Sequence, residues 1–300
     1  MAENECGDIK TTGKKKVRNG YFFLSFVPFG ILLAVQSVAT LPGMIMSIVE
    51  IEKENLGYEM NVLMEVFNKK HALPGYLAYC VISLAIFIPW YYKAIVKHGA
   101  KVRYKRALGV KPVLKTLALM LSLYFVITGA FVLAEMFVPR VISEYNEMMK
   151  MTSLGINLLL TVLYGYILGP ITEELCFRGV MYGFLEKSGI NHMLAIFVQA
   201  ALFAIMHMNL VQGIYAFGLG MILGYLRYKY KTVFMTIGAH MMFNFLGIFV
   251  EQLIGESGVS DVLKIVVGAV GLVAAVVLMI FTVKDKESYA AEQAEPQTIS

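Results

Sequence analysis

Polar and charged side chains recur at four-residue spacing within stretches of the sequence that are apolar enough to cross a membrane. The three motifs are Glu173-Glu174-x-x-x-Arg178, Phe203-x-x-x-His207 and His240-x-x-x-Asn244. A carboxylate or an arginine at the centre of a bilayer costs roughly 2.5–3.5 kcal/mol, so several such groups close together in the sequence predict a functional site rather than packing alone.

Helix geometry divides the two adjacent carboxylates of the first motif. Residues four apart share one face of a helix, so Glu174 and Arg178 are expected to pair. Glu173 is turned by about 100° from Glu174 and must find its partner on another helix. The spacing therefore predicts one carboxylate that is neutralised within its own helix and one that is free.

These residue types can support hydrolysis. A glutamate in apolar surroundings suits general base work on water, and a neutral histidine can share or relay the proton. A second histidine with an asparagine supplies neutral donors for a developing oxyanion. Ser188 and Cys176 have no base at an activating spacing, so attack by water is favoured over a covalent intermediate.

The composition indicates a membrane protein. The 300 residues are 58% hydrophobic and 16% charged, far from the mix of a soluble domain. The net charge of +5 comes from basic residues that gather in short loops beside apolar stretches, which is the pattern of membrane orientation. Nucleic-acid binding is therefore not expected.

The apolar stretches predict an all-α fold, a polytopic membrane bundle of about eight transmembrane helices, since a helix needs about 20 residues to cross. The expected spans are residues 21–49, 75–96, 113–138, 155–185, 191–207, 210–226, 232–251 and 262–283. The fourth span is expected to be broken or kinked at Gly169-Pro170. Basic and acidic loops alternate between the spans, which predicts that both termini are cytoplasmic.

This pattern gives a domain plan of three parts. Residues 1–20 are interpreted as a basic cytoplasmic tail, residues 21–283 as the transmembrane bundle, and residues 284–300 as a disordered cytoplasmic tail. The segment around Arg140, Glu144, Glu147 and Lys150 is interpreted as a mixed-charge loop on the outer side. Glu135, near the outer end of its span, is interpreted as a snorkelling side chain.

The three motifs, in this order and at these intervals, resemble the CAAX-processing and bacteriocin-processing (CPBP, or Abi) family of intramembrane endopeptidases. The resemblance covers about residues 155–250, which would form the protease core. It implies that Glu173 activates water with His207, that His240 and Asn244 hold the oxyanion, and that Glu174 and Arg178 support the site.

The resemblance leaves cofactor and substrate open. No cofactor is favoured, because asparagine is an unusual zinc ligand and no His-Glu-x-x-His pair is present. If a divalent metal such as zinc is bound, its ligands would be Glu173, His207, His240 and Asn244. The expected partners are the lipid bilayer and a membrane-embedded or lipidated peptide, either of the prenylated CAAX type or a bacteriocin-type leader.

The same polar layer also fits proteins that are not proteases. A membrane scaffold, an immunity protein or an ion or proton transporter could use these groups. The protein is expected to be an integral, multi-pass membrane protein, located in the plasma membrane if its source is bacterial. The sequence does not determine its oligomeric state.

Overall fold

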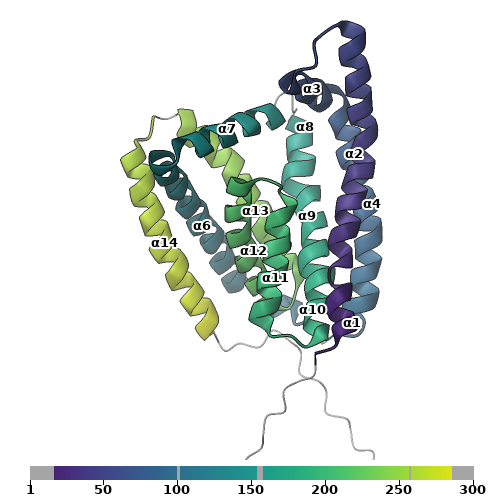
Figure 1. Cartoon of the computed structure of the whole chain (residues 1–300). Helices are drawn as coiled ribbons and strands as arrows, with labels where there is room; N and C mark the ends of the chain where they lie inside the picture. Colours follow the sequence, from purple (N-terminus) through teal and green to yellow (C-terminus); the bar gives the residue numbers. More distant parts are fainter. Residues whose placement is uncertain (1–16, 100–101, 154–157, 257, 286–300) are drawn as a thin grey trace, which may run out of the picture.

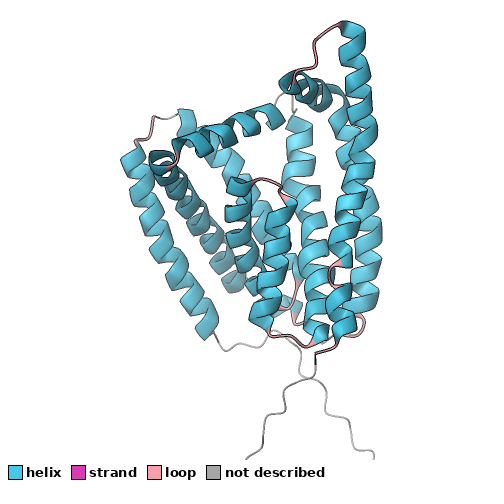
Figure 2. Ribbon diagram, in the orientation of Figure 1, coloured by secondary structure: helices cyan, strands magenta, loops and turns pink. Residues whose placement is uncertain are grey.

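The computed structural model describes residues 17–99, 102–153, 158–256 and 258–285, and every regular element in these ranges is a helix (Figure 2). The α-helices are α1 (Asn19–Leu24), α2 (Val27–Glu54), α3 (Met60–Val66), α4 (Ala72–Tyr91), α5 (Tyr104–Ala107), α6 (Val110–Phe137), α7 (Pro139–Ser153), α8 (Leu158–Leu160), α9 (Gly169–Glu174), α10 (Tyr182–Ser188), α11 (His192–Met206), α12 (Leu210–Tyr230), α13 (Val233–Glu256) and α14 (Asp261–Lys284). Wider π-helical turns occur at η1 (Phe67–His71), η2 (Tyr92–Val96), η3 (Thr161–Leu168) and η4 (Leu175–Met181).

The helices confirm an all-α membrane bundle. Six helical stretches in the described ranges are long and apolar enough to cross a membrane, namely Asn19–Glu54, Met60–Val96, Val110–Phe137, Leu158–Ser188, Leu210–Tyr230 and Asp261–Lys284. The other two expected spans correspond to the shorter apolar helices His192–Met206 and Val233–Gly247. The count of eight spans and the cytoplasmic placement of the termini stay predictions.

The structure bears on two parts of the domain plan, the two tails and the segment near Arg140. Most of the two predicted tails, residues 1–16 and 286–300, lies outside the described residues. The segment near Arg140, predicted as an outer loop, forms helix α7, which lies across the top of the bundle (Figure 1), and its placement on the outer side stays a prediction. On α7, the side chains of Ile142 and Tyr145, three positions apart, are buried, while Arg140 and Glu144 face outward. The segment is therefore an amphipathic helix whose apolar side covers the bundle.

The bundle places the motif-bearing helices in its centre. Helix α9 stands beside α2 and α4, and α11, α12 and α13 lie between α9 and the outer pair α6 and α14 (Figure 1). Small residues allow close approach of α6 to α14 and of α11 to α12. A Cβ atom at Gly268 of α14 would lie 2.9 Å from the Cα of Gly129 in α6, and one at Gly220 of α12 would lie 3.0 Å from the Cβ of Ala200 in α11. This close packing holds α11 and α12 as one unit against the site.

Candidate active site

The first motif begins on α9, which carries Glu173 and Glu174, and continues into η4, which carries Arg178. The π-helical turns η3 and η4 flank α9, and the backbone N–H of Gly169 donates to the carbonyl oxygen of Tyr164, five residues earlier. A Cβ at Gly169 would lie only 2.6 Å from that oxygen, so glycine alone fits there. Pro170, which has no N–H to donate, is placed in the first turn of α9. Of the predicted break or kink at Gly169-Pro170, the break is wrong, since wide turns carry the helix through it, while the kink stays a prediction.

Glu174 is the buried anchor of the site. Its Oε1 atom accepts from Nη1 of Arg178 at 2.7 Å, which is the i,i+4 ion pair that the spacing predicts, and both side chains are 0% exposed. The same Oε1 lies 2.9 Å from Nδ1 of His240 on α13. Because a carboxylate only accepts, Nδ1 of His240 carries the hydrogen. The guanidinium of Arg178 also lies over the ring of Phe203, 4.3 Å from its centre.

Glu173 has a different environment. Its side chain is 16% exposed, and its Oε2 lies 3.8 Å from Nε2 of His240. This distance is too long for a hydrogen bond, but a shared water can hydrogen-bond to two polar groups so separated. The buried side chain of Tyr79 and the half-buried side chain of Tyr164 are close enough to interact electrostatically with the Glu173 carboxylate. His240 therefore joins the two glutamates, with one ring nitrogen facing each.

Phe203 connects His207 to this group. Nδ1 of His207 lies 2.8 Å from the carbonyl oxygen of Phe203, so Nδ1 is the donor and Nε2 is left for other partners. The Phe203 ring makes edge contacts with both histidine rings, at 5.0 Å for His207 and 5.7 Å for His240. Within the described residues, His207 forms no ion pair with Glu173, and the two meet only through the Phe203 and His240 rings.

Asn244 lies one turn beyond His240 on α13. Its Nδ2 donates to the carbonyl oxygen of Gly165 at 2.9 Å, a group in the wide turn η3. An amide nitrogen has two hydrogens, so one donor of Asn244 remains for another acceptor. The side chain is half-buried, which leaves this donor within reach of a bound molecule.

The comparison with protein families agrees with this geometry. Residues 155–246 match the family described as type II CAAX prenyl endopeptidase Rce1-like. This segment, called the Rce1-like core below, is similar to that family. The matched segment begins before η3 and ends in α13, so it contains all three motifs. No curated protein and no solved structure matches the chain.

The side chains of the Rce1-like core, as they are placed, do not fit a metal ion. Among the described residues, no three His, Cys, Asp or Glu side chains converge on one point. The bonds of Nδ1 of His240 to Glu174 and of the amide nitrogen of Asn244 to Gly165 leave Nε2 of His240 and the amide oxygen of Asn244 as the atoms that could ligate an ion, and these two do not make a three-ligand site. We therefore derive no step through a metal, and removal of metal ions is tested below.

Arg227 is a residue of the Rce1-like core that the three motifs do not include. Arg227 is 4% exposed, and its Nε donates to the backbone carbonyl of Arg178 at 3.0 Å. Its guanidinium also lies 5.6 Å from the centre of the Tyr182 ring. Arg227 thus holds the wide turn η4 that carries Arg178. Its spacing from the motif contains no signal of this contact, because 49 residues separate donor and acceptor.

Proposed function

We propose that this protein cuts a peptide bond in a membrane-associated peptide with a lipidated, CAAX-type C-terminus, by direct attack of water. The observation that carries the proposal is the unequal pairing of the two adjacent glutamates. Glu174 is neutralised by Arg178 and His240, whereas Glu173 has no hydrogen-bond partner among the described residues and is partly open. A free carboxylate beside a fixed histidine is suited to general base catalysis.

In the proposed reaction, Glu173 removes a proton from water while the water oxygen bonds to the carbonyl carbon of the substrate. The carbonyl oxygen becomes an oxyanion, and the remaining amide hydrogen of Asn244 is a donor for it. When the tetrahedral intermediate collapses, the C–N bond breaks and the proton held by Glu173 passes to the leaving amine. No atom outside the substrate, the water and these side chains is needed.

The two histidines are proposed to assist from opposite sides of the Phe203 ring. Nδ1 of His240 is held by Glu174, so its Nε2 is directed to the side of Glu173 and can donate to the oxyanion when protonated. The backbone of Phe203 fixes the tautomer of His207, so Nε2 of His207 can accept and return a proton of the water. Glu174 and Arg178 are positioning residues in this scheme, because they act through His240.

The test is cleavage by purified, reconstituted protein. Wild-type protein is incubated with a library that contains prenylated CAAX peptides and bacteriocin-type leader peptides, and products are identified by mass spectrometry. Loss of a general base lowers the rate by about 10²–10⁴-fold, so Glu173→Gln is expected to lose at least about 100-fold in kcat. Glu52→Gln, at an exposed position on α2, is the matched control and is expected to retain full activity.

A parallel reaction with a strong chelator tests the role of metals. Activity that survives chelation and is lost in Glu173→Gln supports the proposed mechanism. Activity that is lost on chelation and restored by one divalent ion would refute the metal-free scheme. Cleavage of leader peptides alone would change the substrate class, and equal cleavage by both variants would remove Glu173 from the mechanism. If no peptide is cleaved, a transport or scaffold function would be favoured instead.

A further inference from the structure

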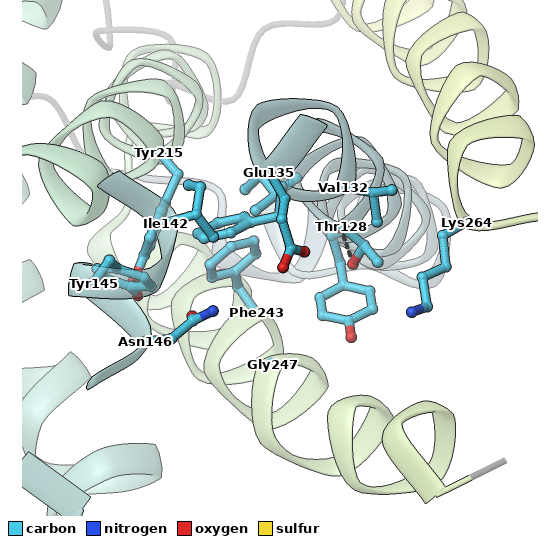
Figure 3. A pocket seen from close by; sticks show the side chains of 13 residues that line it. Thr128, Val132, Glu135, Ile142, Tyr145, Asn146, Tyr215, Phe243, Gly247 and Lys264 are labelled. Carbon is cyan, nitrogen blue, oxygen red and sulfur yellow. Dashed lines mark hydrogen bonds between the residues drawn. The ribbon is translucent and has the colours of Figure 1, made fainter. Parts of the chain in front are cut away.

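A second feature of the bundle is a cavity of about 410 Å³ beneath helix α7 (Figure 3). Its walls come from α6, α7, α12, α13 and α14, and α7 covers one side. Tyr145 of α7 and Tyr215 of α12 share a hydrogen bond between their hydroxyl groups at 3.3 Å. Phe131 of α6 contacts both of these rings, at 5.6 and 6.1 Å between ring centres. This aromatic cluster gives the cavity a fixed wall.

Helix α13 links the cavity to the candidate active site. Phe243 and Gly247 line the cavity, while His240 and Asn244 of the same helix belong to the site. At 1.5 Å per residue, the two cavity residues lie about 4.5 and 10.5 Å along the helix axis from His240. An extended peptide advances about 3.3 Å per residue, so a substrate at the site would bring side chains into the cavity about one to three residues from the bond that is cut.

The charge of the cavity comes from Glu135 near the end of α6. Figure 3 shows its carboxylate directed into the cavity, and it has no hydrogen-bond or ion-pair partner among the described residues. Lys264 also lines the cavity, but its ammonium is 3.1 Å from the carboxylate of Asp261, one turn away on α14. The lysine charge is thus balanced within α14. The cavity therefore presents an unpaired carboxylate next to aromatic rings.

Carboxylates and aromatic faces together bind organic cations, through charge-assisted hydrogen bonds and cation–π contacts. We propose that this cavity is the subsite for a basic side chain, lysine or arginine, of the peptide substrate, and that Glu135 selects it. This rests on the proposed function, because the occupant is a residue of the peptide that is cut. The sequence interpretation of Glu135 as a snorkelling side chain is replaced by a role in substrate selection.

The test compares two peptides that differ only in having lysine or glutamate at the positions within three residues of the cut bond. Wild-type protein is expected to prefer the lysine peptide about tenfold in kcat/KM, the size of one favourable cation contact. Glu135→Lys is expected to reverse this preference, and each rate is divided by the rate of the same protein on a peptide with alanine at these positions. Glu144→Lys is the matched control, since Glu144 is an exposed α7 residue outside the cavity and is expected to change nothing.

Binding separates this proposal from the proposed function. The same peptides, labelled with a fluorophore, are bound to Glu173→Gln protein and to Glu173→Gln with Glu135→Gln, and their affinities are measured by anisotropy. Lysine-selective binding that needs Glu135, without cleavage by wild-type protein, would support the cavity and refute the protease. Cleavage with a lysine preference that survives in Glu135→Lys would refute the cavity. A third outcome is that the protein binds both peptides equally but binds vesicles that contain an amine-headgroup lipid only when Glu135 is present. This result would assign the cavity to lipid and would also overturn the proposal.

Discussion

Replacement of Arg178 by methionine removes the cation that neutralises Glu174 while it keeps a long apolar stem. The two side chains are 0% exposed and 2.7 Å apart, so in the Arg178→Met variant the carboxylate stays buried with only His240 beside it. Breaking a buried ion pair from one side costs about 3–5 kcal/mol, because the remaining charge has lost both water and partner. The guanidinium contact with Phe203, about 0.5–2 kcal/mol, is lost in the same change.

The destabilisation is measured as the free energy of unfolding in mixed micelles, followed by helical circular dichroism. Arg178→Met is expected to lower it by about 3–5 kcal/mol. The double variant Arg178→Met with Glu174→Gln has no unpaired charge, so it is expected to be more stable than the single variant, with a coupling of about 0.5–3 kcal/mol.

Helix α7 offers a matched control for this prediction. Arg140 and Glu144 form the same i,i+4 ion pair at 2.8 Å, but their side chains are 91% and 63% exposed. Exposed pairs contribute little, so Arg140→Met is expected to leave the free energy of unfolding unchanged. Equal losses in Arg178→Met and Arg140→Met, or a double variant no more stable than Arg178→Met, would refute the reasoning that burial makes Glu174 depend on its partner.

Two further changes test how the helices hold the site. Arg227→Met removes the donor to a buried backbone carbonyl of η4 and is expected to cost about 1–3 kcal/mol and to lower kcat more than it raises KM, whereas Arg140→Met should change neither. A purely structural role would leave kcat of the folded fraction intact. Gly268→Ala places a Cβ 2.9 Å from the Cα of Gly129 and is expected to lower the free energy of unfolding by about 1–3 kcal/mol. Gly218→Ala, with nothing within 4 Å, is its control, and equal losses would contradict the packing argument.

Local patterns in the sequence were enough for the class of fold and for part of the site. Apolar stretches of about 20 residues predicted membrane helices, since the bilayer permits few other structures. The four-residue spacing of Glu174 and Arg178 predicted their ion pair, because residues four apart on a helix are neighbours wherever that helix lies. The three motifs also identified the segment that carries the Rce1-like match.

Contacts between side chains on different helices could not be predicted from such local patterns. His240 is 66 residues from Glu174, and its ring nitrogens face the two glutamates only because α13 packs against α9 in one register. The pairing of Glu173 with His207, implied by the resemblance, stays a prediction about the reaction, while the resting geometry brings His240 closer. The wide turn η3 ends where the N–H of Gly169 donates to Tyr164, whereas the residues alone equally suggested a break or a kink at Gly169-Pro170.

The sequence by itself determined that this protein is a helical membrane protein with a glutamate, histidine and asparagine site, because hydrophobic length and helical spacing act within one segment. Only the tertiary structure decided which carboxylate is neutralised from two helices, that α7 covers a cavity lined by Glu135, and that Arg227 is buried against η4. Those outcomes depend on how separate helices pack and rotate against each other. The free energy of that packing is shared among residues far apart in the chain, so no single motif encodes it.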